Sequence, residues 1–179
     1  MNSIKIVSKK NVFDGGRFKV KKVELEIKNV KKTHFDVERK PVVCVFPLTD
    51  SYEIYLISQY RYFFEKNILE CVAGFIDENE TSLKAAKREL KEEAGLLASQ
   101  WELIGKQDLA ASVVKGTLFL FLAKDLEEAA QDLKTGEVIK VVKMPLEEAV
   151  KKVMSGEINS VETVSGILIL DRLRREKKL

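Results

Sequence analysis

The sequence has little cysteine and little histidine, and each shortage argues against a class of site. Its two cysteines, Cys44 and Cys71, both lie in apolar runs, where a thiol packs as a small hydrophobic group, and two cysteines do not make a disulfide framework. The single histidine, His34, argues against histidine-rich metal sites and against a Ser-His-Asp mechanism. Any chemistry must therefore be carried by carboxylates.

Long hydrophobic runs and a charge excess of one sign are also missing. No stretch approaches the roughly 20 apolar residues that a membrane-spanning helix needs, and the first residues, MNSIK, lack the apolar segment of a signal peptide. The 31 basic and 28 acidic residues leave a net charge of +3, too small to indicate a general nucleic-acid or membrane binder. We expect a cytoplasmic protein with neither kind of partner.

The chain has 179 residues, of which 45% are hydrophobic, enough for one compact domain with a small appendage. Residues 1–40 are basic and alternate between apolar and charged side chains, which predicts a small antiparallel β-sheet. The alternation changes phase at Lys21-Lys22, which favours a bulge or bend. A sheet of this size is marginal alone, so we expect residues 1–40 to pack on the main domain, residues 41–179, or on a second copy of the chain.

From residue 41 the sequence is typical of an α/β domain. Strands are expected at 42–48, 54–60, 68–72, 101–109, 117–123 and 138–142, and helices at 81–94, 145–155 and 161–177. Asn79 is a candidate N-cap for the first helix. Gly95 stands where a left-handed C-terminal cap belongs.

The helix expected over 81–94 carries three carboxylates on one stripe, because Glu89, Glu92 and Glu93 are spaced i, i+3 and i+4. Clustered carboxylates repel one another unless a cation lies among them, and oxygen ligands suit a hard divalent ion such as Mg²⁺ or Mn²⁺. The alternative is a solvated acidic face in which Arg88 pairs with Glu92. The buried face of this helix is expected to consist of Leu83, Ala86, Leu90 and Ala94.

A wider spacing surrounds this helix. Gly74 is followed after five residues by Glu80 and after seven more by Arg88-Glu89-Leu90, and Glu92-Glu93 and Gly95-Leu96 complete the series. The series resembles the signature of the Nudix hydrolase family, with every defining position matched. The resemblance implies an α/β/α sandwich around a mixed sheet, and an enzyme that uses a metal ion to hydrolyse a diphosphate linked to another group.

The resemblance also implies roles for individual residues. Glu89 and Glu93 would be the main metal ligands and Glu92 would support the metal or a bound water. The backbone carbonyl of Ala73 would complete the coordination sphere. Arg88 and Glu80 would orient the loop and the helix by charge-assisted hydrogen bonds rather than touch the substrate.

Flanking segments narrow the resemblance to ADP-ribose pyrophosphatases and related nucleoside-diphosphate-sugar hydrolases. These segments are Val42–Leu48, Gln59-Tyr60-Arg61, Leu69-Glu70 before Ala73-Gly74, and Gly156-Glu157-Ile158 with Thr163. The implied substrate is ADP-ribose or a similar nucleotide sugar, bound by Gln59, Tyr60, Arg61 and Glu70. Alternatively, Arg61 forms a surface salt bridge and Tyr60 and Phe63 serve in packing. The subfamily also implies a homodimer to which the N-terminal sheet contributes.

One segment departs from the family. Ala110–Gly116 contains no acidic residue, whereas family members commonly carry there a carboxylate that positions the attacking water. Glu92 or Glu137 could take that role. The departure keeps two alternatives open, namely a hydrolase that prefers another nucleotide sugar such as GDP-mannose, and a non-catalytic Nudix module that binds a nucleotide sugar as a signal.

Overall fold

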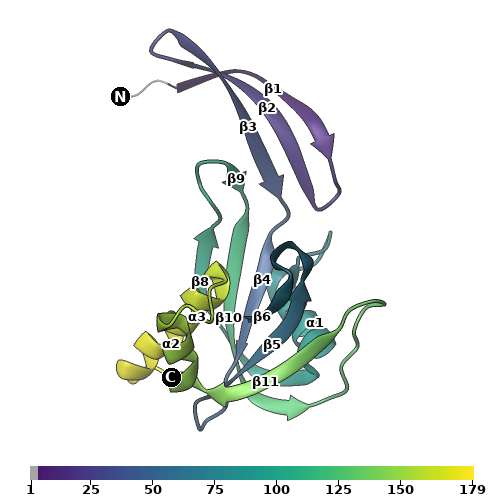
Figure 1. The fold of residues 1–179 in the computed structure, drawn as a ribbon, viewed down its shortest axis with the longest axis vertical. Helices are drawn as coiled ribbons and strands as arrows, with labels where there is room; N and C mark the ends of the chain where they lie inside the picture. Colours follow the sequence, from purple (N-terminus) through teal and green to yellow (C-terminus); the bar gives the residue numbers. More distant parts are fainter. Residues whose placement is uncertain (1–3) are drawn as a thin grey trace. The chain divides into compact units, whose positions relative to one another are not determined.

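A computed structural model describes residues 4–179, which form two compact units (Figure 1). Of these residues, 4–41 and Gln107–Thr117 form the first unit, and Val42–Lys106 and Leu118–Leu179 form the second. None of the helices within the described residues has the length and hydrophobicity needed to cross a membrane.

The first unit is a four-stranded sheet in the order β1-β2-β3-β9. Its strands are β1 (Ile4–Asp14), β2 (Phe18–Ile27), β3 (Val30–Arg39) and β9 (Val114–Lys115). The first three pair antiparallel, as the sequence predicts, and β9 pairs parallel to β3. Lys28 and Asn29 form the turn between β2 and β3 with positive φ angles.

The bulge expected at Lys21-Lys22 is absent from β2, which pairs with β3 without interruption from Phe18 to Ile27. The irregularities lie on β1 instead, between Ile6 and Ser8 and between Asn11 and Phe13. The prediction failed because it assumed that the apolar side chains of β2 must all face a buried side of the sheet. In this thin sheet Val23 is the one fully buried residue among the described residues of β1, β2 and β3, so a change of phase forces no bulge.

The second unit contains two sheets. Their strands are β4 (Val42–Pro47), β5 (Glu53–Arg61), β6 (Lys66–Glu70), β7 (Val72–Phe75), β8 (Leu96–Asp108), β10 (Thr117–Glu128) and β11 (Ile139–Pro145). The first sheet has the order β7-β4-β10-β8 and is mixed, because β4 runs parallel to β10 and antiparallel to β7. The second has the order β11-β5-β6 and is antiparallel. This arrangement agrees with the α/β class that the sequence predicts and with the mixed sheet that the family resemblance implies.

The helices are α1 (Ser82–Ala94), α2 (Leu146–Met154) and α3 (Val161–Arg175), and a 3₁₀ turn, η1 (Tyr62–Phe64), follows β5. Helix α1 lies on one side of the sheets and the α2–α3 pair on the other (Figure 1). The N-cap of α1 is Thr81, whose hydroxyl accepts a hydrogen bond from the Lys84 amide at 3.2 Å, so the expected cap at Asn79 is wrong. Asn79 lies two residues before Thr81, with φ +66°. Gly95 ends the helix in the left-handed conformation, as predicted.

The core of the second unit is built around β4, all of whose residues are buried. Ala86, Leu90 and Ala94 of α1 pack into this core as expected, and Ala85 joins them. Leu83 is 38% exposed because it lies in the first turn of α1, before the helix reaches the sheet. The effect of this packing is to fix α1 tightly against β7, which places the carboxylates of the helix beside that strand.

Candidate active site

The carboxylates of α1 face β7, and the absence of a side chain at Gly74 makes their position possible. A Cβ atom at residue 74 would lie 2.0 Å from the carboxyl carbon of Glu89. The carboxylate of Glu89 therefore fills the space that a side chain on β7 would occupy. Glu89 and Glu93 are 4% and 8% exposed, whereas Glu92, on the outer side of the stripe, is only partly buried.

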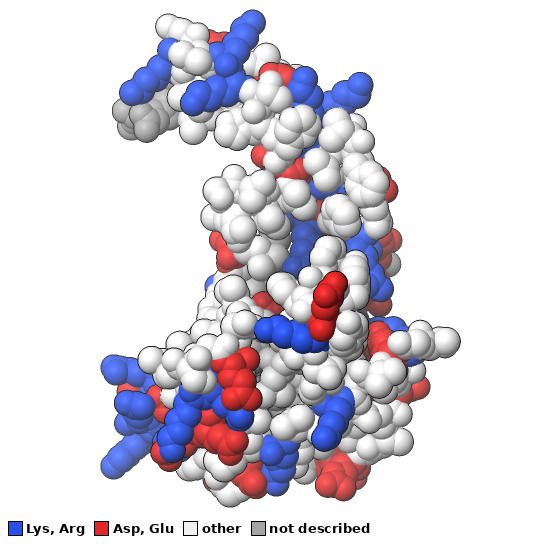
Figure 2. Space-filling view, in the orientation of Figure 1, with Lys and Arg blue, Asp and Glu red and all other residues white. Residues whose placement is uncertain are grey.

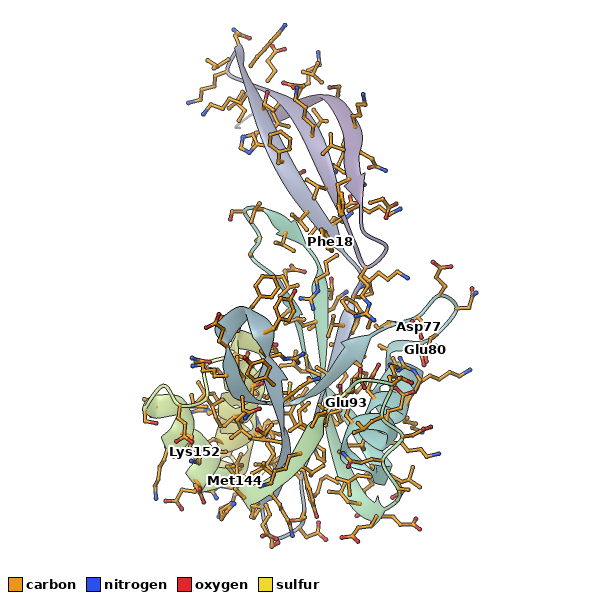
Figure 3. All side chains as sticks on the ribbon, turned by 45° about the vertical axis from the view of Figure 1, so that its right-hand side comes forward. Phe18, Asp77, Glu80, Glu93, Met144 and Lys152 are labelled. Carbon is orange, nitrogen blue, oxygen red and sulfur yellow. The ribbon has the colours of Figure 1, made fainter. Side chains whose placement is uncertain are left out.

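Glu93 is the second buried carboxylate of this cluster, and Figure 3 shows it between α1 and the strands. Its Oε2 accepts a hydrogen bond from the Ala73 amide at 3.1 Å. Burial raises the pKa of Glu93 to about 8; the Ala73 amide opposes this shift, and the charges of Glu89 and Glu137 add to it. Burial also raises the pKa of Glu89, against the opposing effect of Arg88.

Arg88 ties the loop before α1 to the helix. Its Nε and Nη2 donate to the two carboxylate oxygens of Glu80 at 3.1 and 3.0 Å, and Nη2 also donates to the Phe75 carbonyl at 3.0 Å. Glu80 in turn accepts a hydrogen bond from the Asp77 amide at 3.2 Å, and Figure 3 shows Asp77 and Glu80 side by side. This geometry agrees with the orienting role expected for Arg88 and Glu80.

Two cations lie against Glu89 and Glu92. Arg88 Nη1 contacts Glu89 Oε1 and lies 3.2 Å from Glu92 Oε2, which is the i, i+4 pair named as an alternative above. Lys134 Nζ lies 3.1 Å from Glu92 Oε2 and 3.9 Å from Glu89 Oε1. Within residues 4–179 no three histidine, cysteine or acidic side chains converge into a ready metal cage. The negative charges of Glu89 and Glu92 are therefore balanced by the side-chain cations of Arg88 and Lys134.

The donor set nevertheless fits a divalent ion. Glu89 and Glu93 are buried carboxylates whose raised pKa values report the cost of holding charge without full compensation. A hard cation bound between carboxylate oxygens would lower that cost, and oxygen is the donor that such cations prefer. Ala73 lies in β7 opposite Cys44 and contributes backbone polar groups beside Glu93.

The residues expected to bind substrate lie on β5 and β6. Arg61 donates from Nε to Glu70 Oε2 at 2.7 Å, and its Nη2 lies 2.7 Å from the same oxygen, so the ion pair offered as the alternative for Arg61 is present. Burial raises the pKa of Glu70, and the hydrogen bond and charge of Arg61 oppose that rise. Gln59 of β5 pairs with Ile68 of β6 on one side and with Ile139 of β11 on the other.

The aromatic residues next to Arg61 do not serve as core packing. Tyr60 is 57% exposed and Phe63 is 80% exposed, so the packing alternative for these two residues is wrong. Phe63 stacks on Tyr62 with ring centroids 4.5 Å apart, in the η1 turn, which no sequence pattern predicts. The second unit thus presents a stacked aromatic surface beside the Arg61–Glu70 pair.

Glu137 enters the site from the loop between β10 and β11. Its charge raises the pKa of Glu93, and its Oε2 accepts a hydrogen bond from the Lys134 amide at 3.1 Å.

The acid-free segment Ala110–Gly116 forms a turn in the first unit, where the Val113 and Val114 amides donate to the Ala110 carbonyl. Lys134 is a site residue that the sequence does not predict, because a single lysine in a polar loop matches no motif.

Known proteins resemble the chain over nearly its full length. The family model of the NUDIX domain matches residues 38–163. The chain is 28% identical over 169 residues to the ADP-ribose pyrophosphatase of Bacillus subtilis (strain 168) and 27% identical over 169 residues to the methanol dehydrogenase activator of Bacillus methanolicus. Each match covers 93% of this chain and 91% of the relative. The crystal structure of an ADP compounds hydrolase shares the fold, with a TM-score of 0.87, 24% identity, and coverage of 100% of this chain and 98% of that one.

Proposed function

The chain belongs to the Nudix family, and we propose that it hydrolyses the diphosphate bond of ADP-ribose or a related nucleoside diphosphate sugar to a nucleoside monophosphate and a sugar phosphate. The similarity to the Bacillus subtilis ADP-ribose pyrophosphatase over 93% of the chain supports this substrate class. The observation that carries the proposal is the pair of buried glutamates, Glu89 and Glu93, held against β7 with raised pKa values.

Nudix pyrophosphohydrolases need a divalent metal ion, and we assign Mg²⁺, or Mn²⁺, to the carboxylates of α1. Glu89, Glu92 and Glu93 would hold it, together with the Ala73 carbonyl. Such an ion draws charge from phosphate oxygens and lowers the pKa of a bound water. Arg88 would hold α1 and its preceding loop in place through Glu80 and the Phe75 carbonyl while the substrate binds.

Glu137 is our candidate for the group that takes the proton from the attacking water. Glu92 is less suited, because it is a proposed metal ligand and Arg88 Nη1 lies 3.2 Å from its Oε2. Glu137 Oε2 accepts only a backbone amide in the described structure, which leaves Oε1 to accept a proton. The negative charge of Glu137 adds to the raised pKa of Glu93, which supports a place for both carboxylates in one site. This role for Glu137 supplies the acid that Ala110–Gly116 lacks.

Arg61, Glu70, Gln59 and Tyr60 are the proposed substrate-binding residues. The Arg61 guanidinium offers a planar set of donors suited to phosphate oxygens, and Glu70 holds it in a fixed direction at 2.7 Å. The exposed ring of Tyr60, beside the stacked Tyr62 and Phe63, offers a face on which a nucleobase can stack.

We further propose a cytoplasmic homodimer in which the first unit meets a second copy of the chain. Large apolar side chains are exposed on that unit, and Figure 2 shows uncharged surface among its lysines and arginines. The exposed side chains are Ile4, Ile6, Val7, Val12, Phe13, Phe18, Val30, Phe35 and Val113. A sheet with so little buried interior gains stability from a partner surface. The free thiols of Cys44 and Cys71 suit a reducing compartment.

A regulatory role is the second candidate, because one relative is named as an activator of methanol dehydrogenase. Hydrolysis requires Glu93 as a metal ligand, whereas a module that only binds a nucleotide sugar carries out no metal-dependent step. Turnover therefore separates the two roles.

The test is a substrate panel with Mg²⁺ that compares ADP-ribose, GDP-mannose and ADP-glucose by release of monophosphate. We expect fastest turnover of ADP-ribose and loss of turnover on chelation of the metal. Rapid GDP-mannose hydrolysis beside negligible ADP-ribose hydrolysis would overturn the substrate assignment. Binding of the nucleotide sugars without any turnover would favour the regulatory role.

A further inference from the structure

Lys134 occupies the carboxylate oxygens at which the proposed metal ion would bind. Its ammonium lies 3.1 Å from Glu92 Oε2 and 3.9 Å from Glu89 Oε1, and these are its two ion pairs among residues 4–179. A divalent ion bound to the same oxygens leaves no room for the ammonium at these distances and would repel it. The metal and Lys134 therefore exclude each other.

The backbone around Lys134 is held firmly while its side chain is free to leave. The loop that carries it is tied to the C-terminal end of α1, because the Asp132 amide donates to the Glu92 carbonyl at 3.1 Å and the Ala129 amide donates to the Gly95 carbonyl at 2.8 Å. The side chain of Lys134, in contrast, is 57% exposed. Its ammonium can thus move into solvent without rearrangement of the loop.

Arg88 contacts the same two carboxylates but is placed differently. Its side chain is 26% exposed, and its guanidinium is anchored by both oxygens of Glu80 and by the Phe75 carbonyl. Displacing Arg88 would break those hydrogen bonds, whereas displacing Lys134 breaks only its two ion pairs, in which the lysine side chain is 57% exposed. Lys134 is therefore the cation that gives way.

We propose that Lys134 is a positioning residue that acts as an exchangeable counter-ion of the metal site. In the metal-free protein it neutralises Glu89 and Glu92, and a divalent ion must displace it in order to bind. Lys134 therefore lowers the affinity of the site for divalent ions. This inference rests on the metal site of the proposed function. The Lys134 amide also donates a hydrogen bond to Glu137, so Lys134 and the proposed proton acceptor belong to the same turn.

The test is direct Mn²⁺ binding in the absence of nucleotide, with free Mn²⁺ measured by electron paramagnetic resonance. Lys134→Met should bind Mn²⁺ about three- to tenfold more tightly than wild type, the range expected for the loss of two partly exposed ion pairs. Lys134→Arg, which keeps the charge, should bind like wild type. The matched control is Lys140→Met, which removes an exposed lysine of the same unit that makes no ion pair among the described residues.

Equal affinity of Lys134→Met and wild type, or weaker binding by the variant, would overturn the inference, and so would a Lys140→Met variant with the same gain. Failure of wild type to bind Mn²⁺ would overturn both the inference and the proposed metal site. Because no nucleotide is present, an inability to hydrolyse ADP-ribose would count against the substrate assignment and leave this result unaffected.

Discussion

Gly74 and Glu89 are in direct contact across β7 and α1: a Cβ atom at residue 74 would lie 2.0 Å from the carboxyl carbon of Glu89. Strand and helix approach so closely here because residue 74 has no side chain. The glycine of the motif thus has a specific function in this chain, which is to give space to a carboxylate. A side chain at position 74 and the present position of Glu89 are incompatible.

Gly74→Ala should consequently destabilise the protein by about 1–3 kcal/mol, as overpacking of a filled site does, and should lower turnover because Glu89 is displaced. Urea unfolding measures the first effect and monophosphate release the second. The control is Gly105→Ala in β8, where the nearest atom to an added Cβ is 3.7 Å away, and we expect a change within about 0.5 kcal/mol. A Gly74→Ala protein as stable and active as wild type would contradict the contact.

Arg88→Lys tests the anchor between the β7–α1 loop and the helix. A lysine keeps the charge but loses the two-pronged bond to Glu80 and the bond to the Phe75 carbonyl, so we expect a loss of about 1–3 kcal/mol in the free energy of unfolding. Arg172→Lys, in an exposed pair with Glu176, is the control and should cost less than about 0.5 kcal/mol. Equal effects of the two substitutions would show that the Glu80 bond adds nothing.

Much of the second unit is predictable from the sequence because its patterns are local. The fully apolar run of β4, the helical spacing of Ala86, Leu90 and Ala94, and the stop at Gly95 each follow from neighbours in the chain. The α1 carboxylates could be predicted for the same reason, since one helix fixes their spacing.

The features that the sequence did not predict depend on contacts between distant segments. Lys134 reaches Glu92 across 42 positions of the chain, and no local pattern marks it. Thr81 rather than Asn79 caps α1, because the loop turns at Asn79 before the helix begins. The bulges of β1 could not be placed from the sequence. All residues of β1 are exposed, so burial does not determine where apolar and polar side chains alternate along the strand.

Glu70 predicts a pH dependence of stability. Its pKa in the folded protein is raised above the usual value of 4.5, so the folded state keeps a proton that the unfolded state releases. Its contribution to stability is therefore fully present below about pH 4.5 and is lost as pH rises through the folded-state pKa. Glu70→Gln, which cannot lose a proton, should gain stability relative to wild type as pH rises from 4 to about 7.

Glu53→Gln is the control of opposite sign for that measurement. Lys143 lowers the pKa of Glu53, so the contribution of Glu53 is present above about pH 4.5 and is lost as pH falls. Relative to wild type, Glu53→Gln should thus gain stability towards low pH. Chemical unfolding of the three proteins at several pH values gives the comparison, and parallel curves for wild type and Glu70→Gln would contradict the shifted pKa of Glu70.

The measurement closest to the central claim is ADP-ribose turnover by Glu93→Gln at saturating Mg²⁺, with folding checked by circular dichroism. Glutamine keeps the shape and the bond from the Ala73 amide but removes the charge that would hold the ion. We predict a folded protein whose turnover falls on the order of a hundred- to a thousandfold, beside unchanged turnover for the control Glu147→Gln on the exposed face of α2. Wild-type turnover by folded Glu93→Gln would contradict the account.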